Sequence, residues 1–171
     1  MVADTKTFIE MSRRAMHLEP ILLEELIQKT VGRLNMKKSA GDIRIDTALE
    51  KTAPFILGDP ADMDALFFHL LQNSLEAVDP ANPHIRISSA TNPLLPNRMQ
   101  IEIFNTGIPI TLADPEKLFS PFYSTKYFGS GFGLAIAHLA VKRNYGRLDI
   151  QPVLGKGTKV LMTLPSPGQN D

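Results

Sequence analysis

Three polar side chains recur on one stripe of a strongly apolar segment, at spacings of four and three residues. They are His69, Asn73 and Glu76, and in a helix these spacings bring side chains onto one face. The carboxamide oxygen of an asparagine can ligate a hard cation such as magnesium, which reaches protein through few ligands while it binds phosphates. A solvated helix face has the same pattern, so the stripe alone leaves both interpretations open.

A second group of residues has the composition of a phosphate-binding loop. Lys126 precedes Gly129, Gly131 and Gly133, and Leu134 carries the run into a segment predicted as a helix. A helix start exposes unpaired amides and a partial positive charge, glycine lets phosphate approach closely, and lysine supplies a point charge. No βαβ unit with a ribose-binding acid follows, which disfavours a nicotinamide cofactor. The alternative is a hinge before a core helix.

Two shorter segments place small or polar residues where predicted strands end or begin. Asn105 is the last residue of a predicted strand, and Gly107 follows it before Ile110. Asn105 could accept a hydrogen bond from a purine amine, and Gly107 permits a close backbone approach or a positive φ. The second segment, residues 155–157 followed by Thr158, is typical of a hairpin turn. Neither segment is specific by itself.

The elements that must position these residues follow from hydrophobic periodicity and turn residues. Helices are predicted over 5–16, 21–34, 59–78 and 131–144, and Asp59 with Pro60 supplies the start of the third. Strands are predicted over 42–47, 53–57, 84–90, 99–105, 147–153 and 158–164. The first two are expected to be partners, the next two an antiparallel pair and the last two a hairpin.

The order of these elements predicts an α/β (α+β) two-layer sandwich, in which helices cover one face of a mixed, mostly antiparallel sheet. With 171 residues, 43% of them hydrophobic, the chain suits one ordinary domain. An irregular stretch is expected over 106–130.

Charge and composition exclude several classes of function. Lys plus Arg equals Asp plus Glu at 18 each, so no global field attracts nucleic acid or an anionic membrane. No apolar stretch approaches the roughly 20 residues of a bilayer span, so this chain is expected not to insert into a membrane. The lack of cysteine and of a signal-peptide pattern predicts a cytoplasmic protein, whose parent could be membrane-attached through segments not present.

Taken in chain order, these segments resemble the asparagine box, first glycine box, phenylalanine box, second glycine box and final Gly-x-Gly-Thr of the sensor histidine kinase catalytic domain. That family shares the Bergerat fold with gyrase, the mismatch-repair ATPases and the heat-shock chaperones. The most specific run is Phe119-Ser-Pro-Phe-Tyr-Ser-Thr-Lys126 with Gly129-Ser-Gly-Phe-Gly-Leu134. The resemblance spans about 18–165 and implies an adenine pocket between helix and sheet, with a mobile lid over about 109–130.

Carried over by position, the resemblance assigns the base and metal contacts. It makes Asn73 the magnesium ligand and Gly107 the glycine beneath adenine. Asn105 falls where the family usually has the aspartate that receives the adenine amine, with Ile110 in the same box, and Thr158 supports the adenine network.

The resemblance also assigns the phosphate contacts and the lid. Gly129, Gly131 and Gly133 fall on the phosphate loop, Leu134 borders the base and Lys126 lies near the phosphates. His69, Asn73 and Lys126 form the implied catalytic group, and two aromatic residues, Phe119 and Phe122, would anchor the lid.

Three positions depart from the family pattern. His69 stands where kinases commonly have Asn and the hydrolysing relatives have a catalytic Glu. Asn105 is an amide in place of a carboxylate, and Pro109 replaces the second glycine of its box.

The implied function is the ATP-binding catalytic domain of a two-component sensor histidine kinase. It would position magnesium-bound ATP so that the γ-phosphoryl group passes to a histidine on a separate dimerisation domain absent from this chain. The implied partners are that domain and a response regulator protein. Residues 1–17 are interpreted as a helical remnant of the upstream dimerisation or linker region, 18–165 as the catalytic domain and 166–171 as a disordered tail.

Two alternatives stay open at this point. One is an ATPase or serine kinase of the same superfamily, against which the absence of a glutamate at position 69 argues. The other is a degenerate Bergerat-fold binding module with weak or no nucleotide binding, in which Asn105 and Pro109 have reduced the affinity. His17 does not match the family's acceptor box and is interpreted as a linker residue.

Overall fold

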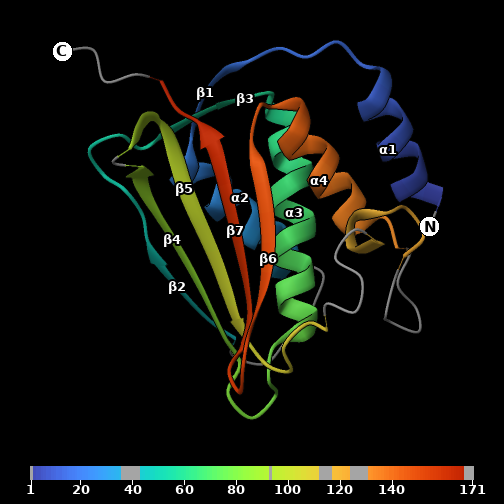
Figure 1. Ribbon diagram of the computed structural model, residues 1–171, viewed down its shortest axis with the longest axis vertical. Coiled ribbons are helices and arrows are strands. Elements are labelled where there is room, and N and C mark those ends of the chain that lie inside the picture. The colour runs from blue at the N-terminus through green and yellow to red at the C-terminus, as the bar shows by residue number, and fades with distance from the viewer. Residues whose placement is uncertain (1, 36–42, 93, 112–116, 124–130, 168–171) are drawn as a thin grey trace.

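The core of the fold is a five-stranded sheet (Figure 1). Its strands, in spatial order, are β2 (Arg44–Ala48), β4 (His84–Asn92), β5 (Leu95–Thr106), β7 (Gly157–Pro165) and β6 (Arg147–Val153). β2 runs parallel to β4, and each of the other neighbouring pairs is antiparallel. The computed structural model describes residues 2–35, 43–92, 94–111, 117–123 and 131–167.

Helices cover one face of this sheet. α3 (Pro60–Ala77) and α4 (Gly133–Arg143) pack together over it, α2 (Leu23–Asn35) contacts α3, and α1 (Val2–Arg13) lies along the outer side of α4 (Figure 1). This arrangement confirms the predicted two-layer sandwich with a mixed, mostly antiparallel sheet. Within the described ranges, no helix combines the length and the apolar character that crossing a membrane requires.

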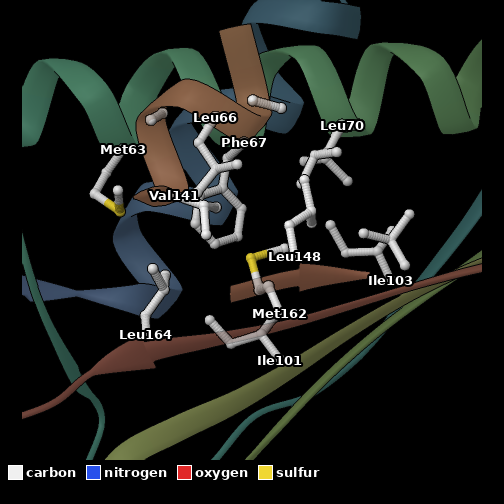
Figure 2. Packing of buried hydrophobic residues seen from close by; sticks show 14 of the residues in the cluster. Met63, Leu66, Phe67, Leu70, Ile101, Ile103, Val141, Leu148, Met162 and Leu164 are labelled. Carbon is white, nitrogen blue, oxygen red and sulfur yellow. The ribbon is translucent and has the colours of Figure 1, made fainter. Parts of the chain in front are cut away.

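Alternation along the strands gives the sheet one apolar and one polar face. Ile101 and Ile103 of β5 are fully buried and face the helix layer, where Phe67 of α3 is also fully buried (Figure 2). Between them in sequence, Glu102 points to the opposite face and pairs with Lys159 of β7 at 3.3 Å. Burying a side chain such as Phe67 contributes roughly 2–3 kcal/mol, so this layer contact stabilises the relative positions of helix and sheet.

One predicted strand pairing is wrong. The strand at 53–57 was expected to pair with the strand at 42–47, but β3 (Phe55–Gly58) pairs antiparallel with β1 (Glu19–Leu22) in a separate two-stranded sheet. β1 itself was not predicted. Proximity in sequence favours a hairpin, whereas β2 reaches its parallel partner β4 only through the long connection that contains α3.

Other boundaries shift by a few residues. α1 begins and ends three residues before the predicted helix at 5–16, and the predicted irregular stretch contains a short 3-10 helix, η1 (Lys117–Phe119). Ser166, placed by the sequence in the tail, is buried, and its amide donates to the carbonyl of Asn97 at 2.9 Å. Residues 168–171 lie outside the described residues.

The start of α3 is held by its predicted cap. Asp59 accepts hydrogen bonds from the amides of Ala61 and Asp62, both at 3.1 Å. Burial alone raises the pKa of Asp59, but hydrogen bonds from the His17 amide and the Arg14 guanidinium outweigh it and lower the pKa to about 2. The carboxylate is therefore charged at neutral pH and fixes both the helix start and the chain that enters β1.

Candidate functional site

A large cleft opens between α3, the end of β5 and the start of α4, with a volume of about 1410 Å³. Nine of the eleven residues predicted for the site line it: His69, Asn73, Asn105, Gly107, Ile110, Gly131, Gly133, Leu134 and Thr158. The other two, Lys126 and Gly129, lie outside the described residues. Segments up to 89 positions apart in the chain, from 69 to 158, thus meet at one cleft.

Asn105 and Thr158 form one wall of the cleft as a cross-strand pair. They are opposite each other in the register of β5 and β7, and Asn105 is 3% exposed. The Asn105 amide nitrogen donates to the carbonyl of Thr106 at 3.0 Å, and the Thr158 hydroxyl accepts from the amide of Ile110 at 3.0 Å. One N–H of the Asn105 carboxamide is therefore engaged by the backbone, and its oxygen can accept a hydrogen bond from a ligand in the cleft.

Gly107 lies where the end of β5 approaches the end of α3. Its φ is +135°, and a Cβ built at this position would lie 2.0 Å from the carbonyl oxygen of Ala77. Its amide donates to the carbonyl of Lys156 at 3.1 Å. The approach is too close for any side chain, so glycine here is a requirement of the backbone.

The opposite end of the cleft has the features of an anion site. Among the residues that the structure describes, no side chain caps the start of α4 at Gly133, so its first amides could bind a ligand. A Cβ at Gly133 would lie 3.4 Å from Nδ1 of His69 and 3.8 Å from Nδ2 of Asn73. The polar stripe of α3 therefore contacts the glycine-rich start of α4 at this end of the cleft.

The two phenylalanines predicted to anchor the lid both contact the α4 region. Phe119 stacks on His138 of α4, with ring centroids 4.4 Å apart and an interplanar angle of 17°. Burial, with a smaller contribution from the charge of Lys142, lowers the pKa of His138, so the stacked ring is mainly neutral at pH 7. Phe122, at φ +69°, packs edge-on against Phe132 at 4.7 Å.

A magnesium ion fits the donor set of the cleft only if a ligand brings most of its oxygens. In the part of the chain that the structure describes, no group of three His, Asp or Glu side chains is placed to hold a metal. Asn73 is half-buried on the cleft wall and could supply one carboxamide oxygen. This agrees with the habit of magnesium, which takes one or two protein ligands and completes its shell with phosphate and water.

Sequence reasoning missed several residues of the cleft. Tyr123, Ile150 and Val160 line it and add apolar surface. Alternation along the last two strands could have identified Ile150 and Val160 as facing the helix layer. Asp4 also lines the cleft, and no local signal links it to the other segments.

The comparison with family models matches residues 58–168 to the histidine kinase-, DNA gyrase B-, and HSP90-like ATPases. Sporulation kinase E of Bacillus subtilis is 25% identical over 162 residues, which are 94% of this chain and 21% of that protein. Sensor protein kinase WalK of Staphylococcus aureus is 32% identical over 145 residues, 81% of this chain and 34% of that protein. The chain thus spans between a fifth and about a third of these relatives.

Solved structures share the fold. The mycobacterial sensor histidine kinase MprB superposes with a TM-score of 0.74 at 22% identity, covering 90% of this chain and 100% of that one. Full-length ShkA in complex with AMPPNP gives a TM-score of 0.81 at 19% identity, covering 99% of this chain and 36% of that one.

Proposed function

Because this chain belongs to the family of histidine kinase-, DNA gyrase B-, and HSP90-like ATPases and is an ATP-binding domain of the sensor histidine kinase type, we propose that it presents magnesium-bound ATP to a histidine on a separate domain of a longer kinase. The γ-phosphoryl group would pass to a nitrogen of that histidine. The phosphorylated histidine would then supply a response regulator. Since ATP is the substrate, we place this domain on the cytoplasmic side of the cell.

In this proposal each wall of the cleft has one task. The oxygen of Asn105 accepts the adenine amine, while Gly107 lets the base lie against the backbone. The first amides of α4 bind phosphate oxygens, which the glycines at 131 and 133 allow to approach. Asn73 would hold magnesium, which would neutralise phosphate charge.

For transfer of the γ-phosphoryl group, the protein mainly has to position the reacting atoms and neutralise charge. A histidine nitrogen attacks the γ-phosphorus, the bond to the bridging oxygen breaks, and ADP leaves with that oxygen. Catalysis then depends on holding the phosphorus in line with the attacking nitrogen, and on neutralising charge around it. His69 and Asn73 face the start of α4, so their side chains could interact directly with the charge around the γ-phosphorus.

The observation that carries the proposal is the meeting of nine predicted residues at one cleft. A degenerate module could retain the fold, but it would have no reason to retain the tight approach at Gly107, the Asn105 and Thr158 pair and an uncapped start of α4 together. The glutamate that serves as the usual base for hydrolysis is absent, since position 69 is histidine. These features favour an ATP-binding kinase domain over a hydrolase and over a degenerate module.

The first prediction tests the proposal on the unmodified chain. It should bind a non-hydrolysable ATP analogue in the presence of magnesium, and it should not label itself with ATP, because the acceptor box is missing. Calorimetric titration measures the first property, and incubation with γ-labelled ATP followed by acid treatment measures the second. A titration without heat of binding would favour the degenerate module, and acid-labile label on His17 would contradict the assignment of the acceptor to another domain.

The second prediction concerns the strength of the adenine contact. Asn105→Asp should tighten ATP and ADP about equally, roughly fivefold, because a carboxylate accepts the amine with charge assistance and both nucleotides carry the same base. GTP should stay weak, since guanine offers a carbonyl where adenine offers its amine. Titrations of the variant with all three nucleotides would decide this. Weaker ATP binding would show that Asn105 does not face the base.

A further inference from the structure

The N-terminal helix, α1, packs along the side of α4 that leads to the cleft. Phe8 of α1 packs edge-on against Phe132, directly before α4, with ring centroids 5.9 Å apart. At the other end, Arg143 of α4 donates through Nη2 to the carbonyl of Arg14 at 3.0 Å. The middle of α1 therefore lies against the start of α4 and the end of α1 against the end of α4, and α1 runs parallel to α4 (Figure 1).

Directly after the end of α1, a buried ionic cluster holds the chain against α3 and α4. The Arg14 guanidinium donates to Asp59 at 2.6 Å and to Asp62 at 2.7 Å, and these two carboxylates are 2% and 0% exposed. Arg143 donates to the other oxygen of Asp62 at 2.9 Å. Met11, near the end of α1, is 5% exposed. Packing and charge together fix the direction in which α1 points.

That direction brings an acidic side chain to the cleft. Asp4 precedes Phe8 by four residues, one helical turn, so both side chains lie on the same face of α1. Asp4 is half-buried and lines the same cleft as Gly131 and Gly133. A carboxylate near the start of a helix is attracted by the same amides and dipole that would bind phosphate.

We propose that α1 is an inhibitory strap: when it is docked on α4, the Asp4 carboxylate opposes the triphosphate of ATP, so docking of α1 and binding of ATP weaken each other. This inference rests on the proposed function, because it takes the cleft to be the ATP site. By linkage, whatever lifts α1 from α4 raises the affinity for ATP, and ATP loosens α1 to the same extent. The affinity of the domain for ATP would thus depend on whether α1 is docked on α4.

The charge part of the proposal is tested with Asp4→Asn in the full chain. Removing one negative charge near the triphosphate should tighten binding of an ATP analogue with magnesium about fivefold and leave adenosine, which has no phosphate, unchanged. The control is Glu10→Gln, which removes the same charge from an exposed part of α1, where Glu10 lies 3.5 Å from Lys6. This control should bind the analogue like the unmodified chain.

The coupling is tested by hydrogen exchange of the α1 amides in the unmodified chain. They should exchange several-fold faster when the ATP analogue is bound, and adenosine should have no such effect. Equal analogue affinity for the unmodified chain and Asp4→Asn, weaker binding by Asp4→Asn, or slower exchange in α1 with nucleotide would each overturn the strap. If neither the analogue nor adenosine binds any variant, the proposed function fails first, and this outcome is distinct from the other three.

Discussion

Gly107→Ala is expected to lower the free energy of unfolding by about 3 kcal/mol and to remove measurable ATP binding. The new Cβ would lie 2.0 Å from the carbonyl oxygen of Ala77, and the φ of +135° is one that only glycine adopts readily. The clash is with backbone on both sides, so no rotation of a side chain relieves it. The end of β5 and the end of α3 must separate, and both line the cleft.

A matched control is available in the hairpin between β6 and β7. Gly155 also has a positive φ, +67°, but a Cβ there would meet nothing within 4 Å. Gly155→Ala should cost about 1 kcal/mol, the ordinary penalty of a left-handed residue, and leave nucleotide binding unchanged. Urea unfolding and titration with an ATP analogue measure the two effects. Equal stability losses at the two positions would show that the approach of Gly107 to Ala77 is not a tight one.

Asn73→Ala is expected to weaken binding of ATP by about a hundredfold when magnesium is present, because a ligand to a charged group contributes up to about 3 kcal/mol. The fold should remain intact, since Asn73 is half-buried in the middle of α3 and alanine has the higher helix propensity. With magnesium removed by a chelator, the variant and the unmodified chain should bind ATP with similar, weaker affinities.

The control for Asn73 is a carboxamide on another helix, outside the cleft. Gln28 of α2 is exposed, and its nitrogen donates to Glu24 at 3.4 Å. Gln28→Ala should therefore change ATP affinity little, with or without magnesium. Circular dichroism confirms the helix content of both variants. Magnesium-independent weakening in Asn73→Ala would indicate a direct contact with phosphate and would contradict the role as metal ligand.

The candidate site was accessible from sequence because its residues stand at places where the chain changes its local structure. Gly107 follows the end of a strand and Gly133 begins a helix. The requirement for glycine at both positions is local, since it concerns backbone angles and free amides. His69 and Asn73 were placed on one face by helical spacing alone. Their meeting with Asn105 and Thr158 at one cleft was implied by the resemblance, and the register of β5 and β7 accounts for the pairing of Asn105 with Thr158.

By itself, the sequence determined the helices over the long periodic segments and two antiparallel pairs of the main sheet, β4 with β5 and β6 with β7, because periodicity, caps and turns act between near neighbours. Nine residues that line the cleft came from the family resemblance. Only the tertiary structure decided that β3 pairs with β1, that Arg14 reaches two aspartates 45 and 48 residues away, and that Asp4 lies at the cleft. These choices depend on which surfaces are left to be covered once the sheet and α3 have packed. Burial of charge and apolar area between distant segments has no local pattern, so it is settled by packing alone.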